Sequence, residues 1–166
     1  MLALTNYFRI IDTVNIDKIK KELSTLDYDS TYALQGVNAT DSVFKHIMPA
    51  NKLVNAWERS APGLTADQLV NFHFNLPYIN SLLLKYNVGY ARVMILNSKE
   101  CYTYHKDKTK RIHIPIETNE NNFFVMNDKV FRLPADGSVY EVDTTNIHTF
   151  VNASIIKRRH IVGTVL

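Results

Sequence analysis

The apolar residues that follow Asn15 recur at helical spacing. They are Ile16, Ile19, Leu23 and Leu26. Residues three and four positions apart share one face of a helix, and Asn is a favoured N-cap residue. The pattern therefore predicts an amphipathic helix that begins just after Asn15.

A second helix start is predicted at Thr65–Gln68, which has the form of a capping box. Leu69, Phe72 and His73 would share one face of this helix, and Pro77 is expected to end or kink it. A further helical piece is expected over 79–86. Residues 28–60 follow no clear period, and we expect loops and short helices there.

From Tyr90 onward the pattern changes to short stretches typical of strands, separated by turn sequences such as Asn127-Asp128 and Asp136-Gly137. The expected strands are 92–96, 102–106, 111–117, 123–126, 129–133, 139–142, 147–151 and 158–165. Eight short strands favour two facing four-stranded sheets. We therefore expect an α+β, mainly β fold: a double-stranded β-helix (jelly roll, cupin-like) with N-terminal helices packed on one sheet. The expected organisation is one domain, 1–166, with a mostly helical part over 1–88 and the jelly-roll core over 89–166.

Composition narrows the class of protein. The chain has 166 residues, of which 46% are hydrophobic and 21% charged, enough apolar content for one folded core and too much for intrinsic disorder. The single cysteine, Cys101, excludes a disulfide-stapled fold and favours a reducing compartment. The sequence has no signal-peptide pattern and no run of about 20 apolar residues. We expect a cytoplasmic protein without membrane contact.

The charge is small and unevenly placed. The net charge is +3, with −1 over residues 1–83 and +4 over residues 84–166. A protein that binds duplex nucleic acid usually carries a denser basic stripe, so we expect no nucleic-acid partner. The excess in the second half either is scattered over a solvated surface or serves to bind a small anion.

His105 and Asp107 form the first candidate site. On a strand, residues two apart point to the same side, so both side chains would enter the barrel together. His148, at the start of another expected strand, is the natural third member. Two histidines and one carboxylate occupy one face of an octahedron and suit non-haem Fe(II). An H-x-D pair also arises by chance, as a solvated turn after a strand.

Two arginine-histidine pairs with the same spacing follow. Arg158 lies ten residues after His148 and two before His160, and its guanidinium can grip a carboxylate with two hydrogen bonds. The alternative is a basic surface run over 157–159. Arg111 and His113 share one face of a strand whose other face carries only isoleucine, so the polar face would line a cavity or an exposed edge.

Taken in order, HKD, RIHIPIETN, IHTF and RRHIV resemble the aspartyl/asparaginyl β-hydroxylase-like branch of the 2-oxoglutarate- and Fe(II)-dependent oxygenases. The resemblance covers roughly residues 90–166. It implies that His105, Asp107 and His148 are the catalytic iron ligands. It also implies that Arg158 binds the far carboxylate of 2-oxoglutarate.

The resemblance extends to the remaining pocket residues. Arg111 and His113 match a pocket-lining R-x-H segment that contacts co-substrate or substrate, and His160 matches a recurrent histidine after the co-substrate arginine. Some relatives carry a hydroxyl residue eleven positions before the first histidine that helps to hold the co-substrate. Here that position is Met94, and Arg92 and Tyr102 are nearby candidates to replace it.

The implied activity is hydroxylation of an amino-acid residue, in a peptide or protein, or of a free amino acid. Dioxygen and 2-oxoglutarate are consumed, succinate and CO2 are released, and ascorbate acts as a supporting reductant. Two other classes remain open. One is a non-catalytic jelly-roll domain that binds a small anionic ligand, and Met94 is its best support. The other is a zinc-bearing cupin-like isomerase, which would prefer a first motif rich in histidine with a glutamate.

Overall fold

The computed structural model describes residues 6–40, 43 and 64–166. Its helices are α1 (Ile16–Leu23), the 3₁₀ turn η1 (Ala66–Gln68) and α3 (Pro77–Lys85). Its strands are β1 (Phe8–Thr13), β2 (Tyr32–Ala33), β3 (Gln35–Gly36), β4 (Asn71–Phe72), β5 (Val88–Leu96), β6 (Glu100–Cys101), β7 (Arg111–Glu117), β8 (Asn122–Met126), β9 (Lys129–Phe131), β10 (Ser138–Val142), β11 (His148–Asn152) and β12 (Arg158–Val165).

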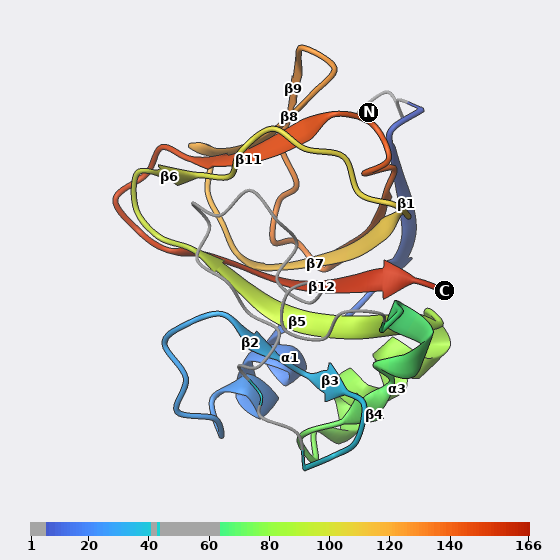
Figure 1. Cartoon of the computed structure of the whole chain (residues 1–166). Helices are drawn as coiled ribbons and strands as arrows, with labels where there is room; N and C mark the ends of the chain where they lie inside the picture. Colours follow the sequence, from blue (N-terminus) through green and yellow to red (C-terminus); the bar gives the residue numbers. More distant parts are fainter. Residues whose placement is uncertain (1–5, 41–42, 44–63) are drawn as a thin grey trace.

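The strands form two facing sheets, which confirms the predicted double-stranded β-helix. The larger sheet has the order β1-β10-β7-β12-β5-β2 and the smaller one β6-β11-β8-β9, while β3 pairs with β4. In Figure 1 the larger sheet runs between the smaller sheet above and α1 and α3 below. The described sheets have six and four strands rather than four and four, because β1 and β2 from the N-terminal half join the larger sheet.

Side chains along the strands of the larger sheet point alternately to its two faces, and both faces are buried. Ile112, Ile114 and Ile116 of β7 pack toward α1 and α3 in the main apolar core. Each such fully buried side chain stabilises the fold by about 1.5–3 kcal/mol relative to its exposure. The intervening residues Arg111 and His113 are buried on the opposite face, toward the smaller sheet. The expected two-sided strand 111–117 is confirmed, and its polar face looks inward rather than to solvent.

Helix α1 begins as predicted, with the Asn15 side chain accepting a hydrogen bond from the backbone N–H of Lys18 at 3.0 Å. Pro77 does not end a helix but occupies the first turn of α3, where its missing N–H costs nothing. The free N–H groups of Tyr78 and Ile79 donate to the carboxylate of Glu22, at 2.8 and 2.9 Å. Glu22 of α1 thus caps α3 and joins the two helices.

The helix predicted from Thr65 is wrong beyond its first turn. The capping box forms, but the helix is only the 3₁₀ turn η1, and the chain then pairs as β4 with β3. The backbone oxygen of Leu69 accepts from the N–H of Tyr90, so neighbouring strands take the bonds a helix would need. The turn packs directly on β5, because a Cβ added at Gly89 would lie 2.0 Å from the Ala66 carbonyl oxygen.

The strand expected over 102–106 is also wrong. Strand β6 ends at Cys101. Beyond it the N–H of Tyr102 still donates to the Phe150 carbonyl of β11, while the Tyr102 carbonyl accepts from the Thr149 hydroxyl instead of from a backbone N–H. His105 keeps only an isolated bridge to His148. In the N-terminal half, β1 was not expected. Residues 44–60 of the stretch expected to hold loops and short helices lie outside the described part of the chain.

Candidate metal centre

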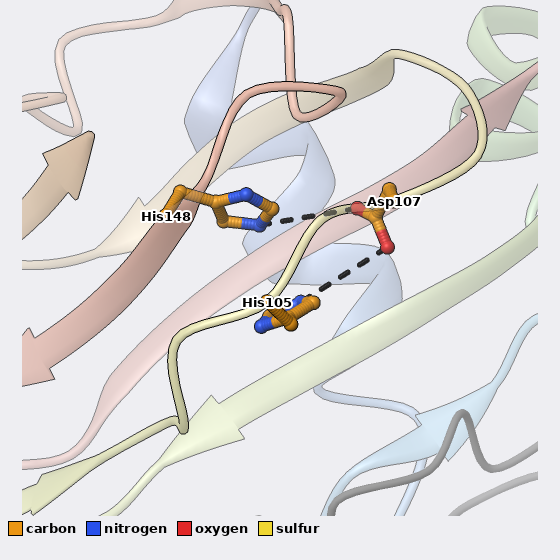
Figure 2. Close-up of side chains that lie close together, drawn as sticks. All are labelled: His105, Asp107 and His148. Atoms are coloured by element: carbon orange, nitrogen blue, oxygen red, sulfur yellow. Dashed lines mark ion pairs between the residues drawn. The ribbon is translucent and has the colours of Figure 1, made fainter. Parts of the chain in front are cut away.

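His105, Asp107 and His148 come together at one end of the space between the sheets. Each offers one ligand atom, and these atoms lie within 4.8 Å of one another. Nε2 of His105 is 4.0 Å from Oδ1 of Asp107, and Nε2 of His148 is 3.9 Å from Oδ2. Figure 2 shows both imidazoles facing this carboxylate. The structure therefore brings together the three residues that the sequence predicted as a metal site.

Backbone hydrogen bonds, not a continuous strand, position the three residues. The N–H of His105 donates to the carbonyl of His148 at 3.1 Å, and the reverse bond measures 2.9 Å. The N–H of Asp107 donates to the carbonyl of Thr144 at 2.9 Å. Asp107 is thereby fixed in the loop before β7, and its side chain turns back toward the two histidines.

Both imidazoles are oriented by backbone carbonyls. Nδ1 of His105 lies 2.8 Å from the carbonyl oxygen of Thr103, and Nδ1 of His148 lies 2.8 Å from that of Asn146. A carbonyl only accepts, so each Nδ1 carries the proton and each Nε2 presents a lone pair to the cluster. Burial lowers the pKa of His148, which favours the neutral form that metals bind.

Arg111 holds the carboxylate of the cluster. Its Nη2 lies 3.0 Å from Oδ1 of Asp107, and its Nη1 donates to the hydroxyls of Thr164 at 2.9 Å and Thr109 at 3.1 Å. Burial alone would raise the pKa of Asp107, but Arg111, the two histidines and a hydrogen bond with Thr144 together outweigh it, so the pKa lies below its usual value. The Asp107–Arg111 contact was not predicted, because it depends on how the loop between Asp107 and β7 turns back, and spacing along the sequence does not show this.

Arg158 is a buried cation with no carboxylate partner in the described part of the chain. Only 4% of the residue is exposed. Its Nη2 donates to Nδ1 of His160 at 2.8 Å, and its guanidinium carbon lies 4.5 Å from the centre of the Phe150 ring. Burial lowers its pKa to about 9 and the nearby Tyr102 opposes this shift, so Arg158 stays charged at neutral pH. An unpaired buried charge calls for an anionic ligand.

His113 and His160 lie side by side. His160 contacts Arg158, and the His113 ring lies 5.4 Å from the Phe150 ring. Their Nδ1 atoms are 3.4 Å apart, and the Nε2 atom of each is buried without a hydrogen-bond partner among the described residues. Burial, followed by repulsion from Arg158, lowers the pKa of both well below the usual value. Both imidazoles are therefore neutral. Buried polar atoms are normally hydrogen-bonded, so the two Nε2 atoms are suited to bind a polar ligand.

The apolar wall of the site was not predicted. Phe150 lies two residues after His148 on β11 and contacts Phe124 of β8, with ring centres 3.7 Å apart. Phe150 also lies against both Arg158 and the His148 ring, the latter at 5.9 Å. The available signal was the period of two along β11, which puts His148 and Phe150 on one face.

Met94 and Tyr102 both lie at the site. Met94 is paired directly opposite His160 in the larger sheet, so the two side chains share its inner face. The Tyr102 ring lies 5.9 Å from that of Phe150. Burial raises the pKa of Tyr102, and the nearby charge of Arg158 partly opposes this rise.

No family model matches this sequence. No curated protein matches it either. Among solved structures, the chain is similar to AviO1 from Streptomyces viridochromogenes Tue57, with 13% identity, a TM-score of 0.51, and coverage of 96% of this chain and 89% of the other. It is also similar to an oxidoreductase of the 2OG-Fe(II) oxygenase family from Burkholderia pseudomallei, with 13% identity, a TM-score of 0.50 and coverage of 90% and 76%. At this identity the likeness concerns the fold.

No helix within the described ranges is long and apolar enough to cross a membrane.

Proposed function

We propose that the chain is a 2-oxoglutarate- and Fe(II)-dependent oxygenase that hydroxylates an amino-acid residue or a free amino acid, with release of succinate and CO2. The observation that carries the proposal is the pairing of two features around one ring. His148 of the His-Asp-His cluster lies against the Phe150 ring, and Arg158, which has no described carboxylate partner, lies against the same ring. A short dicarboxylate that chelates a metal with one end needs such a cation to bind its other end.

The donor set fits Fe(II). Two neutral imidazoles and one carboxylate with open positions are typical of non-haem Fe(II) sites. The three ligand atoms lie within 4.8 Å of one another, so small side-chain rotations would bring them to the spacing of about 3 Å that neighbouring ligands of one octahedral ion require. Bound Fe(II) would supply the activation of dioxygen and the oxidative decarboxylation of 2-oxoglutarate. In this proposal His105, Asp107 and His148 hold the metal.

The protein binds and orients the co-substrate. Arg158 binds the far carboxylate of 2-oxoglutarate, and this carboxylate supplies the anionic partner that Arg158 does not have among the described residues. Tyr102 supplies the hydroxyl that Met94 lacks, because its ring lies 5.9 Å from the Phe150 ring on which Arg158 also packs. His113 and His160 line the space between, and their unpartnered Nε2 atoms are free to meet polar groups of the bound acid.

The aromatic wall excludes water from the reacting end. Phe124 is 2% exposed and packs against both Phe150 and His113. An apolar wall strengthens the attraction between Arg158 and a carboxylate, because it lowers the local dielectric constant. The surrounding residues thus position the acid and protect the site.

The motif order of residues 90–166 supports a place in the aspartyl/asparaginyl β-hydroxylase-like branch. The fold likeness to a protein named as a 2OG-Fe(II) oxygenase supports the broader class. We further propose dioxygen and an amino-acid, peptide or protein substrate as partners, ascorbate as a supporting reductant, and a cytoplasmic location. Nucleic acid and membranes are not among the proposed partners.

The test is anaerobic absorption spectroscopy. Fe(II) plus 2-oxoglutarate should give the wild-type protein a weak visible charge-transfer band, which Asp107→Asn should abolish or weaken strongly. Asp128→Asn, at an exposed turn position, is the matched control and should keep the band. Absence of the band in the wild type, with retained binding of 2-oxoglutarate, would favour the non-catalytic anion-binding domain instead.

A further inference from the structure

Arg92 is a second arginine on the inner face of the larger sheet for which the described residues offer no acidic partner. It is half-buried on β5 and its guanidinium carbon lies 4.2 Å from the centre of the Tyr90 ring. Its Nη1 donates to the carbonyl of Tyr90 at 2.9 Å, and its Nε contacts the Met94 sulfur at 3.4 Å. No acceptor for Nη2 exists among the described residues. The guanidinium is held in place but not neutralised.

The strand register places Arg92 in the pocket. Arg92 is paired with Val162 of β12, and Val162 is paired with His113 of β7. Directly paired residues point to the same side of a sheet, so Arg92 and His113 share the inner face two strands apart, roughly 10 Å. The charge of Arg92 also contributes to the lowered pKa of His113, after burial and the charges of three nearer groups.

Charge balance then defines what Arg92 can bind. Three arginines, Arg92, Arg111 and Arg158, lie on the inner face of the larger sheet. The only described carboxylate that contacts any of them is Asp107, which Arg111 already holds. In the proposed function, one carboxylate of 2-oxoglutarate goes to Arg158 and the other lies at the metal. Arg92 is left as the guanidinium of the three that has neither a described acidic partner nor a proposed anion.

We propose that Arg92 is the receptor for a carboxylate of the substrate, so that the enzyme acts on molecules that carry a carboxylate beside the hydroxylated carbon chain. This inference rests on the proposed function and narrows its substrate class. The planar fork of Arg92 suits a carboxylate, and its stacking on Tyr90 fixes the direction of the fork. The carboxylate belongs either to a free amino acid or to an acidic side chain of a peptide.

The experiment compares acids with their amides. Anaerobic wild-type protein with Fe(II) and saturating 2-oxoglutarate, which occupies Arg158, is titrated by calorimetry. The free-acid arm uses each L-amino acid and its C-terminal amide. The peptide arm uses blocked tripeptides that carry Asp or Asn at the centre. In at least one pair the acid should bind at least about tenfold more tightly, as a charge-assisted hydrogen bond requires.

Variants assign the effect to Arg92. In Arg92→Met the acid-to-amide ratio should fall to within about twofold of one. Arg92→Lys keeps the charge but loses the fork, and should give an intermediate ratio. Arg159→Met removes one positive charge from the same sheet, where Arg159 faces Glu117 at 3.8 Å, and should keep the wild-type ratio. Circular dichroism and thermal melting check the fold of each variant.

Two results overturn the inference: no acid in either arm is preferred over its amide in the wild type, or the preference survives in Arg92→Met. The wild-type comparison decides even if Arg92→Met fails to fold. Failure of the proposed function is separately visible as a missing charge-transfer band. If the wild type prefers acids but shows no charge-transfer band, the carboxylate site is supported and the oxygenase function is rejected. If it shows the band but no preference for acids, only the proposed substrate class is rejected.

Discussion

Arg111 Nη2 lies 3.0 Å from Asp107 Oδ1, and 6% of the Arg111 side chain and 9% of the Asp107 side chain are exposed. The other end of the guanidinium donates to Thr164, so Arg111 is anchored on both sides. One oxygen of the carboxylate is therefore fixed in direction, and the other faces His148. Arg111 acts as a positioning residue for Asp107 rather than as a free cation of the pocket.

Replacing Arg111 should weaken metal binding. Arg111→Met leaves Asp107 without its partner, and loss of a residue that orients a ligand typically lowers metal affinity about 10- to 100-fold. Competition between the protein and a chelator for Fe(II) under anaerobic conditions measures this affinity. An unchanged Fe(II) affinity together with weaker 2-oxoglutarate binding would instead make Arg111 the co-substrate contact that the R-x-H resemblance implies.

Replacing Arg158 should separate function from stability. Arg158→Met removes a buried charge that lacks a carboxylate partner, so the free protein should melt at the same temperature or higher. The same change should lower 2-oxoglutarate affinity by about 100-fold or more, because the anion loses a charged, doubly bonded partner. Added 2-oxoglutarate should then raise the melting temperature of the wild type but not of the variant. Arg159→Met is the matched control, and an equal loss in that variant would contradict the assignment.

Tyr102→Phe tests the hydroxyl beside Arg158. If the phenol contacts the co-substrate, its removal should weaken 2-oxoglutarate binding about fivefold, the effect of one hydrogen bond. Titration of the charge-transfer band with 2-oxoglutarate measures the change. Tyr104→Phe, at a neighbouring position whose side chain is 55% exposed, should have no effect. Equal affinity in Tyr102→Phe and the wild type would remove this role.

Asp12 should make stability depend on pH. Its carboxylate accepts from Lys85 at 2.6 Å, Tyr86 at 2.7 Å and the N–H of Thr13 at 2.9 Å, which lowers its pKa to about 2. The unfolded value is about 4, so this stabilisation is present above that pH and is lost as the pH falls toward 2. The difference in free energy of unfolding between wild type and Asp12→Asn, from urea titrations, should shrink from pH 6 to pH 3. A constant difference would contradict the link.

The sequence located two strands of the larger sheet best, one with alternating apolar and polar residues and one that leads into the apolar C-terminal stretch. The bounds of β7 and β12 agree with the predicted 111–117 and 158–165. The grouping of His105 and Asp107 was predicted from a strand that does not form, and turn hydrogen bonds bring them together instead. Strand β1 could not be predicted, because its place depends on pairing with β10, far along the chain. The helix from Thr65 failed because tertiary bonds to β3 and β5 outweigh a local capping signal.

The most direct test of the central claim is succinate formation from 2-oxoglutarate by purified protein with Fe(II), ascorbate and air. The account predicts slow formation without added substrate in the wild type, and none above background in His105→Ala, whose Nε2 faces Asp107 at 4.0 Å. Chelation of the metal should stop the reaction, and fresh Fe(II) should restore it. The same rate of succinate formation in His105→Ala as in the wild type would contradict the account.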